Sequence, residues 1–316
     1  MLYTKLDGQK ISKIALGCAD FGTKVNKEDA FALLDDYYER GGNLLDTARI
    51  YASWVEGGAN ASESTIGEWI KTRNLRKKIF IATKGGHPPF ENMYSSRLDE
   101  VSLRKDIEES LHYLQTDFVD IYYLHRDDKD RPVSEIMTVL NAFVEEGKAR
   151  YIGVSNWKAE RILEANRYAE ERGLAKIRFS QIMWSYATVN KGGEPDDTLV
   201  IMDDEEYAKY QDSGVLLMPF SSQAQGFYTK AQKTGIENLS PAMQKKYDNP
   251  KNRERLQKLI KISDETGISA TAVSLNYLLR NPLETLPVVG VSSKKYMDDT
   301  LQALDLEEKY FPLLKD

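Results

Sequence analysis

Four polar residues of complementary chemistry lie at or just past the ends of three apolar, strand-like segments. The segments are NLLDT at 43–47, IFIATK at 79–84 and FVDIYYLH at 118–125. The polar residues are Asp46, Tyr51, Lys84 and His125. A carboxylate, a phenol, an ammonium and an imidazole at one place can transfer a proton to a carbonyl. If the segments are neighbouring parallel strands, their carboxyl ends bring these groups to one rim.

Tyr51 is the candidate proton donor of this group. A tyrosine has a reference pKa of about 10, so it needs a nearby cation to stabilise its phenolate. Lys84 is the candidate cation, and Asp46 would keep it charged and oriented. His125 would donate a hydrogen bond to the carbonyl oxygen.

Each of these residues also has an ordinary structural explanation. An Asp at a strand end commonly caps a helix, Tyr51 is one of 18 tyrosines, and a lysine after a buried strand can reach out to solvent. Another alternative is a metal-dependent lyase or isomerase that uses Lys84 for a Schiff base, which requires an unpaired lysine. Asp46 argues against that alternative.

The elements that would position these residues alternate between strand and helix. Expected strands cover 13–16, 43–47, 79–84, 118–124, 151–154, 178–183, 215–219 and 285–290. Expected helices cover 27–39, 62–72, 104–114, 133–146, 158–172, 204–211, 252–266 and 270–280. Eight such units predict one (β/α)8 TIM barrel domain over residues 1–316, with a doubly wound open sheet as the alternative.

Two further segments complete the predicted architecture. Residues 2–11 alternate around Asp7-Gly8, which predicts an N-terminal β-hairpin that caps one end of the barrel. Residues 225–251 are polar and longer than a usual connection, so they are a candidate lid over a substrate or cofactor.

Composition narrows the class of protein. The 43 Lys and Arg against 49 Asp and Glu, without a basic block, argue against a nucleic-acid partner. The charged N-terminal residues and the lack of a long apolar run predict a cytoplasmic chain without a membrane partner. The single cysteine, Cys18, excludes an internal disulfide, and three histidines without zinc-type spacing disfavour a zinc enzyme. A carboxylate magnesium site stays open.

The motifs NLLDTARIYAS, IATKGG, LHRDD and YIGVSNW occur in an order that resembles the aldo-keto reductases. The resemblance runs from LGCADFG near the start to PVVGVSSKKYMDD near the end. It implies a (β/α)8 barrel that reduces an aldehyde or ketone with NADPH. It also implies that Tyr51 is the general acid, that Lys84 and Asp46 tune it, and that His125 orients the carbonyl. The oligomeric state stays open.

The resemblance also implies a cofactor site. Ser155, Asn156 and Gln181 would hold the carboxamide, and Gly17, Cys18 and Asp46 would lie under the nicotinamide. Phe220, where relatives often carry Tyr or Trp, would stack on the ring, with Ser221, Gln223 and Gly226 following it. Gly290, Ser292 and a cation, Lys294 or Lys295, would meet the adenosine phosphate. Asp298 or Asp299 would contact the adenine or ribose side. A Rossmann fingerprint is absent from the sequence.

The expected pocket mouth combines flat apolar and polar side chains. Besides Tyr51 and His125, it should contain Asp20, Trp54, His87, Arg126 and Trp157, with Trp184 either there or buried. Indole faces beside polar groups suit a sugar or polyol carbonyl, although aromatic or short aldehydes also fit. The alternative function is a nucleotide-binding redox sensor with little turnover. A serine at position 292 resembles the aldo-keto reductase branch that contains the potassium-channel β subunits, and this resemblance implies the alternative.

Overall fold

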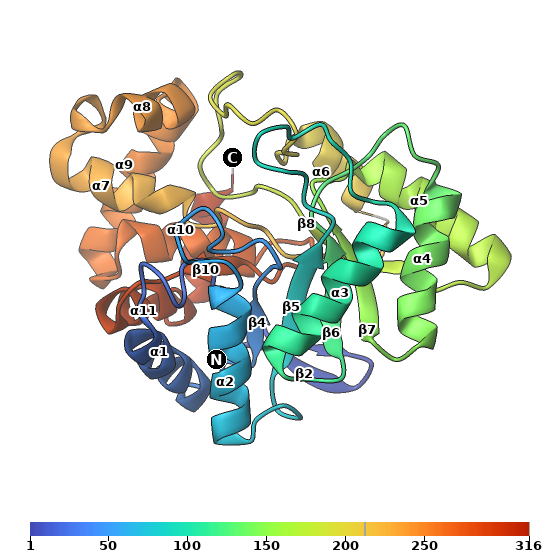
Figure 1. Ribbon diagram of the computed structural model, residues 1–316. Coiled ribbons are helices and arrows are strands. Elements are labelled where there is room, and N and C mark those ends of the chain that lie inside the picture. The colour runs from blue at the N-terminus through green and yellow to red at the C-terminus, as the bar shows by residue number, and fades with distance from the viewer. Residues whose placement is uncertain (212, 316) are drawn as a thin grey trace.

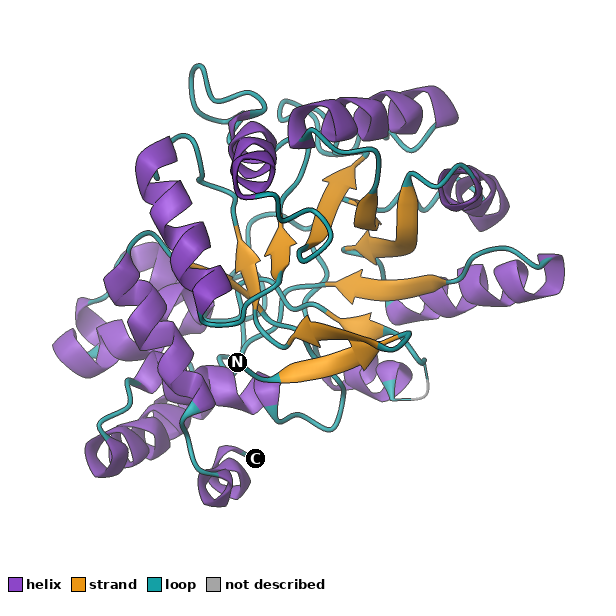
Figure 2. Cartoon of the chain, turned by 90° about the horizontal axis from the view of Figure 1, so that it is seen from below, coloured by secondary structure: helices purple, strands orange, loops and turns teal. Residues whose placement is uncertain are grey.

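A ring of parallel strands forms the centre of the protein, and helices surround it (Figures 1 and 2). The computed structural model describes residues 1–211 and 213–315. The parallel strands are β3 (Ala15–Gly17), β4 (Leu44–Asp46), β5 (Phe80–Gly85), β6 (Val119–Leu124), β7 (Ala149–Ser155), β8 (Ile177–Gln181), β9 (Leu216–Leu217) and β10 (Val288–Gly290). They pair in the order β10-β3-β4-β5-β6-β7-β8-β9.

Hydrogen bonds between β9 and the residues that lead into β10 close the ring. The Leu286 amide donates to the Leu217 carbonyl at 2.7 Å, and the Val288 amide donates to the Pro219 carbonyl at 2.9 Å. A parallel bridge also joins Leu217 to Thr285. The sheet is therefore a barrel, as predicted, and the open-sheet alternative is wrong.

The segments between the strands form helices that pack on the barrel, because the apolar residues of each segment recur on one helical face. In α4 (Val133–Glu145), Val133, Ile136, Met137, Leu140 and Phe143 are buried, at the spacing of an amphipathic helix. The helices after β3, β4, β5, β7 and β8 are α1 (Lys27–Glu39), α2 (Ala61–Arg73), α3 (Glu100–Leu114), α5 (Ala159–Arg172) and α6 (Asp204–Tyr210). Those after β9 and β10 include α9 (Pro250–Thr266), α10 (Ala270–Leu279) and α11 (Lys294–Leu301).

The predicted N-terminal hairpin is confirmed. Strands β1 (Tyr3–Leu6) and β2 (Gln9–Ser12) pair antiparallel, and Asp7 and Gly8 between them have φ angles of 46° and 84°. Both angles lie in the left-handed region that a two-residue hairpin turn of this kind needs. Leu6 and Ile11 pack into the barrel interior beside Leu44 and Phe80, so the hairpin closes the end where the strands begin.

The segment 225–251, expected to be an unusually long polar connection, is instead mostly helical. It contains α7 (Phe227–Thr234) and α8 (Pro241–Tyr247), with 3-10 turns at Ala224–Gly226 and Ile236–Asn238. Phe227, Tyr228 and Ala231 are buried on one side of α7, and the Ser240 hydroxyl caps α8. Helices α7, α8 and α9 lie together beside the barrel (Figure 1). A few apolar residues at helical spacing therefore outweigh the polar composition.

Within residues 1–211 and 213–315, every helix is too short or too polar to span a lipid bilayer.

Candidate active site

Lys84 is the centre of a buried hydrogen-bond cluster at the carboxyl ends of β4 and β5. Its Nζ lies 2.9 Å and 2.8 Å from the two carboxylate oxygens of Asp46, and 2.8 Å from the Thr47 carbonyl. It lies 2.9 Å from the hydroxyl of Tyr51, which the turn after β4 supplies. Asp46 and Lys84 are each only 1% exposed. The structure thus brings three of the four predicted residues into direct contact.

The direction of these hydrogen bonds leaves the Tyr51 proton uncommitted. An ammonium group has three donors and no acceptor, so the Tyr51 oxygen accepts from Lys84. Burial raises the pKa of Tyr51, against the opposing effect of the Lys84 charge, so the phenol stays protonated at neutral pH. Burial alone would lower the pKa of Lys84, but Asp46 and Tyr51 together outweigh it and leave that pKa raised. A Lys84 that is charged at neutral pH and paired with Asp46 is poorly suited to the Schiff-base alternative.

His125 completes the group from the end of β6. Its ring lies edge-on to the Tyr51 ring, with centroids 5.8 Å apart, and the His87 ring lies 4.7 Å away on another side. Burial, with the charges of His87, Lys84 and Arg126, holds the pKa of His125 well below its usual value. Burial also lowers the pKa of His87 to about 4. Both imidazoles are therefore neutral at neutral pH.

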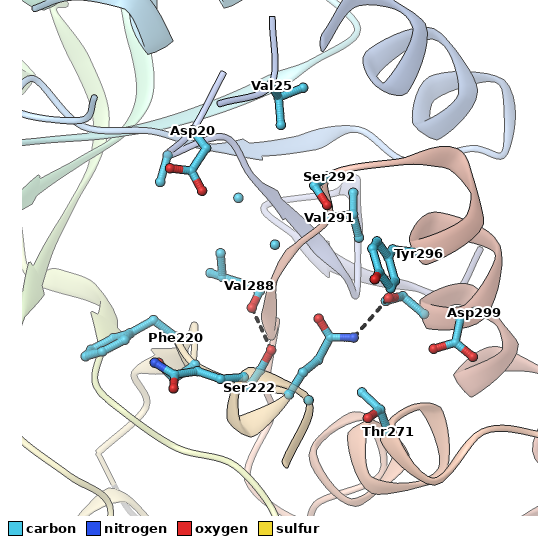
Figure 3. A pocket seen from close by; sticks show the side chains of 18 of the residues that line it. Asp20, Val25, Phe220, Ser222, Thr271, Val288, Val291, Ser292, Tyr296 and Asp299 are labelled. Carbon is cyan, nitrogen blue, oxygen red and sulfur yellow. Dashed lines mark hydrogen bonds between the residues drawn. The ribbon is translucent and has the colours of Figure 1, made fainter. Parts of the chain in front are cut away.

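A cavity of about 610 Å³ extends from Tyr51 and Asp46 toward α10 and α11 (Figure 3). Its volume lies in the range of pockets for small molecules and cofactors. A Cβ on Gly290 would meet nothing within 4 Å, so this glycine keeps part of the cavity wall open. The predicted site residues that line the cavity are Gly17, Asp20, Asp46, Tyr51, Phe220, Ser221, Gln223, Gly226, Gly290, Ser292 and Asp299.

The opposite walls of this cavity come close together at Gln223. Its Nε2 donates to the Thr300 hydroxyl of α11 at 2.9 Å, so the segment after β9 is tied across to the helix after β10 (Figure 3). The Ser222 hydroxyl donates to the Val288 carbonyl at 2.6 Å. The lining of the cavity thus combines an aromatic ring, Phe220, with hydroxyl groups such as that of Ser292.

Three residues expected at the carboxamide are near the catalytic group but already bonded to protein atoms. The Gln181 Nε2 donates to Asp46 at 2.8 Å, and the Ser155 hydroxyl donates to the Gln181 carbonyl at 2.9 Å. The Asn156 Nδ2 donates to the His125 carbonyl at 3.3 Å. Cys18 is fully buried, and burial raises the pKa of its thiol well above the usual value. None of these four residues belongs to the cavity lining.

Lys294 and Asp298 are placed away from the cavity. The Lys294 ammonium lies 2.6 Å from Asp36 of α1, and Asp298 pairs with Arg40. Both residues sit on the side of α11 that faces α1, and neither lines the cavity. The structure therefore does not bring the expected phosphate-binding cation to the ligand space.

Two cations that the sequence reasoning missed do line the cavity. Lys230 and Lys233 are three residues apart on α7, on the same side of that helix. The Lys230 ammonium donates to the Gln225 carbonyl at 2.9 Å. Treating 225–251 as a connection concealed them, whereas the helical spacing of Phe227, Tyr228 and Ala231 was the signal that could have located them.

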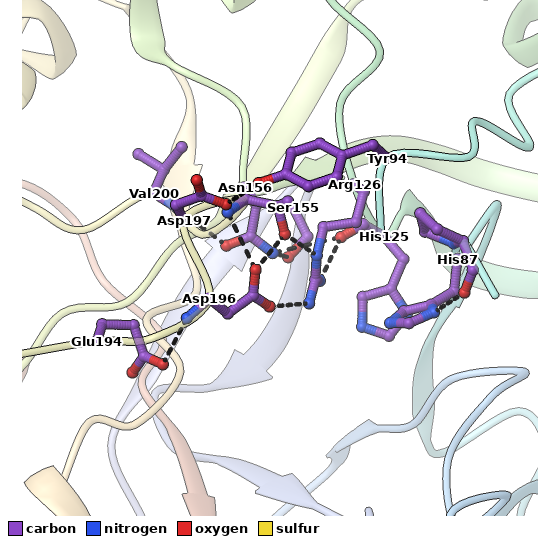
Figure 4. Close-up of polar contacts among 12 residues, drawn as sticks. His87, Tyr94, His125, Arg126, Ser155, Asn156, Glu194, Asp196, Asp197 and Val200 are labelled. Atoms are coloured by element: carbon purple, nitrogen blue, oxygen red, sulfur yellow. Dashed lines mark hydrogen bonds and ion pairs between the residues drawn. The ribbon is translucent and has the colours of Figure 1, made fainter. Parts of the chain in front are cut away.

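The rim around the catalytic group is aromatic. Trp54 is 45% exposed, with its ring 5.9 Å from that of Tyr51, and Phe90 is 47% exposed, 5.5 Å from His87. Asp20 lines the cavity and pairs with Lys24 at 3.3 Å. Arg126 lies beside His125 and pairs with Asp196 at 3.2 Å (Figure 4). The sequence reasoning did not name Phe90 or Asp196.

Trp157 does not lie at the pocket mouth, contrary to the prediction. It is fully buried, and its Nε1 donates to the Arg126 carbonyl at 3.2 Å. The residue lies two positions after the end of β7, and its hydrogen bond places the ring against the β6–α4 connection. Trp184 is also buried, at 6% exposure, against Tyr207 and Tyr277. Of the expected indole faces, Trp54 is the one at the rim.

A group of three or more His, Cys, Asp or Glu side chains able to hold a metal ion is not found in the described part of the chain.

A parallel barrel with a tyrosine, a lysine, an aspartate and a histidine at one rim, beside a cavity of small-molecule size, is the arrangement that the sequence motifs of an oxidoreductase predict. The sequence model of the Aldo/keto reductase family matches residues 13–315. The chain belongs to that family, whose members are oxidoreductases that use nicotinamide cofactors.

Named relatives agree with this membership. The norsolorinic acid reductase stcV of Emericella nidulans is 31% identical over 322 residues, covering 96% of this chain and 76% of the relative. The putative aryl-alcohol dehydrogenase AAD14 of Saccharomyces cerevisiae is 31% identical over 324 residues, covering 96% and 82%. The uncharacterized oxidoreductase YrpG of Bacillus subtilis is 29% identical over 327 residues, covering 100% and 95%.

Proposed function

We propose that this protein reduces an aromatic aldehyde or ketone to the alcohol with NADPH, and that Tyr51 is the general acid. When bound, the reduced nicotinamide supplies the hydride. Tyr51 gives its proton to the carbonyl oxygen, and the Lys84 ammonium stabilises the phenolate that remains. Asp46 keeps that ammonium charged, and the neutral His125 imidazole donates a hydrogen bond that orients the carbonyl.

The observation that carries the proposal is the hydrogen bond between Lys84 and Tyr51. Because the ammonium can only donate, this 2.9 Å contact stabilises the tyrosine oxygen and leaves its proton available. The names of the relatives, which are reductases and dehydrogenases, support turnover rather than a nucleotide-sensing role.

The preference for NADPH over NADH is supported by the charge of the cavity lining. Lys230 and Lys233 face the ligand space from α7, and a 2′-phosphate is the extra anion of NADPH. Ser221, Gln223 and Ser292 would add hydrogen bonds to the same ligand. Lys233→Ala should weaken NADPH binding more than NADH binding, which fluorescence quenching titrations measure. If the variant binds NADPH and NADH more weakly by the same factor, Lys233 contacts a group that the two cofactors share.

The preference for an aromatic substrate rests on a row of rings at the rim. The order is Trp54, Tyr51, His125, His87 and Phe90, with successive centroids 5.9, 5.8, 4.7 and 5.5 Å apart. Flat aromatic groups stack on or against such surfaces. The relatives named aryl-alcohol dehydrogenases support the same class. With Trp157 and Trp184 buried, a sugar has fewer indole faces to bind.

The proposal is tested by following NADPH and NADH oxidation with benzaldehyde-type aldehydes, aryl ketones, aldoses and keto-sugars. We expect the highest kcat/KM for an aryl carbonyl with NADPH. Trp54→Ala should raise KM for aryl substrates and leave short aliphatic aldehydes nearly unchanged. A uniform preference for sugars would refute the substrate class, and turnover of none of these carbonyls would refute the function.

A further inference from the structure

One segment of the β8–α6 connection is fastened to the catalytic mouth through Arg126. This segment, Glu194–Val200, is called loop 194–200 below. The Arg126 Nη2 donates to Asp196 at 3.2 Å and its Nε donates to the Thr198 hydroxyl at 3.0 Å. Its Nη1 donates to the backbone carbonyl of His125 at 2.9 Å. Figure 4 shows Arg126 lying between Asp196 and His125.

A second side chain joins the same loop to the same carbonyl. The Asn156 Nδ2 donates to the His125 carbonyl at 3.3 Å, and the Asn156 Oδ1 accepts from the Val200 amide at 3.3 Å. The His125 carbonyl thus receives two hydrogen bonds, and both donors are held by loop 194–200. Arg126 follows β6 and Asn156 follows β7. Loop 194–200 contacts both side chains and so holds the two donors together at this carbonyl.

The loop itself is locally rigid where it holds Arg126. One Asp196 carboxylate oxygen accepts from the Thr198 amide at 3.0 Å and from the Thr198 hydroxyl at 2.5 Å. The other oxygen is the one that meets Arg126. The Trp157 indole fixes the backbone of Arg126 from below at 3.2 Å. The Arg126 side chain is only 11% exposed, so solvent does not readily replace these partners.

This backbone contact matters because the His125 ring has no hydrogen-bonded anchor of its own. A catalytic imidazole is usually oriented by a hydrogen bond to the ring nitrogen that does not face the substrate. The His125 Nδ1 is buried and has no partner among residues 1–211 and 213–315. Ring contacts with Tyr51 and His87 remain, but the position of the ring depends on the position of its backbone.

We propose that Arg126 and Asp196 are positioning residues, which hold His125 by its backbone carbonyl so that its ring stays directed at the substrate carbonyl. The inference rests on the proposed function of His125 and adds to it a role for loop 194–200. Arg126 acts here by the geometry of its guanidinium, whose three nitrogens each donate in a fixed direction. A charge alone at this position would not hold the carbonyl and the loop together.

The test uses Arg126→Lys, which keeps the charge but loses the fork, and Asp196→Ala. Asp197→Asn is the matched control, because Asp197 is in the same loop but its side chain accepts from the exposed Tyr94 hydroxyl instead. We expect the first two variants to lower kcat by about 10- to 100-fold, as a small displacement of a reacting group does. The Kd for NADPH and the kcat of Asp197→Asn should stay near wild type.

Combination with His125→Ala separates positioning from other effects. If Arg126 acts through His125, then Arg126→Lys should lower kcat by less than about threefold when His125 is already absent. Equal losses in the two backgrounds would overturn the proposal, as would an Arg126→Lys variant with wild-type kcat. Asp196→Asn, which keeps the side-chain shape, replaces Asp196→Ala if that variant does not fold.

A readout without turnover keeps the inference distinct from the proposed function. The chain has only three histidines, so the ring signals of His125 can be assigned in a proton–nitrogen NMR spectrum with His87→Gln as reference. We expect these signals to shift or broaden in Arg126→Lys and Asp196→Ala, and to stay unchanged in Asp197→Asn. Unchanged signals in all three would overturn the inference even if the wild type reduces carbonyls. If the signals shift in Arg126→Lys and Asp196→Ala but the wild type reduces no carbonyl, only the proposed function is refuted.

Discussion

Two of the buried carboxylates with cationic partners lie at opposite ends of the barrel, Asp46 near the carboxyl ends of the strands and Asp120 near the beginning of β6. Each is 1% exposed. Asp120 accepts from Arg76, from Arg150 and from the Ile81 amide, all at 2.9 Å. Asp46 accepts from Lys84 and from Gln181. By composition and burial the two clusters look alike.

They differ in what the cation touches next. Arg76 goes on to the carbonyl oxygens of Ile79 and Phe118 and to the Thr116 hydroxyl, whose own proton is donated to the Phe118 carbonyl, and Arg150 is partly exposed. Lys84 goes on to a tyrosine hydroxyl that lines a cavity. A buried ion pair is therefore a structural device at one end of the barrel and, under the proposed function, part of a proton donor at the other. The uncommitted proton of the neighbouring tyrosine and the cavity beside it make that difference.

The largest expected effect comes from removing the ion pair at the catalytic end. Lys84→Met combined with Asp46→Asn avoids leaving an unpaired buried charge, so the protein should still fold. Loss of the cation that stabilises the phenolate should lower kcat for carbonyl reduction by about 10²- to 10⁴-fold. Steady-state NADPH oxidation measures it. A double variant with near wild-type kcat would remove the distinction between the two clusters.

The complementary change is Asp120→Ala at the other end. It leaves Arg76 and Arg150 without their buried partner, so the free energy of unfolding should fall by about 3 to 5 kcal/mol. Urea unfolding at neutral pH measures this change. At temperatures where the variant is folded, its kcat should equal that of the wild type. A loss of turnover in the folded variant would mean that this cluster also serves the reaction.

Acid should destabilise the catalytic end through the two histidines. The unfolded chain protonates an imidazole near pH 6.5, whereas the lowered pKa of about 4 keeps folded His87 neutral. The unfolded state then binds more protons between these values, so stability is lost as the pH falls through that window. For His87 alone the loss approaches about 3 kcal/mol.

His87→Gln should reduce this acid sensitivity, and His112→Gln, a change at an exposed residue of α3, should not. Urea unfolding of both variants between pH 4 and pH 7, with the wild type as reference, makes the comparison. An identical pH dependence in wild type and His87→Gln would show that the charge state of this ring does not differ between the folded and unfolded chain.

The smallest expected effect is that of pH on turnover near neutrality. The raised pKa of Tyr51 and the lowered pKa of His125 leave both groups in their working forms around neutral pH. The kcat for reduction should therefore be nearly constant there and fall at higher pH, where Tyr51 loses its proton. A change in kcat with a midpoint at about pH 6.5 would instead indicate an imidazole that changes its charge in the active enzyme.

The fold and the centre of the site follow from local features of the sequence. Apolar segments that end in Asp46, Lys84 and His125 define strands and a rim, and Asp7-Gly8 defines a hairpin turn. These signals need only neighbouring residues. The contact between Tyr51 and Lys84 then follows from the barrel geometry.

The surroundings of the site were less predictable because they depend on how distant segments pack. Trp157 is buried because the β6–α4 connection folds over it, which its own sequence neighbours do not reveal. Lys294 faces α1 because Asp36 lies there, while Lys233 reaches the cavity because α7 packs beside it. The sequence gives the type of each of these side chains, but not the direction in which it points.

The most direct measurement is the single-turnover rate of aryl carbonyl reduction by the NADPH complex of Tyr51→Phe, set beside wild type and Asp120→Asn. Removing the hydroxyl and nothing else should slow the reaction by about 10²- to 10⁴-fold while the NADPH Kd stays the same. Asp120→Asn should react at the wild-type rate. A Tyr51→Phe enzyme that reacts as fast as wild type would contradict the assignment of the proton donor.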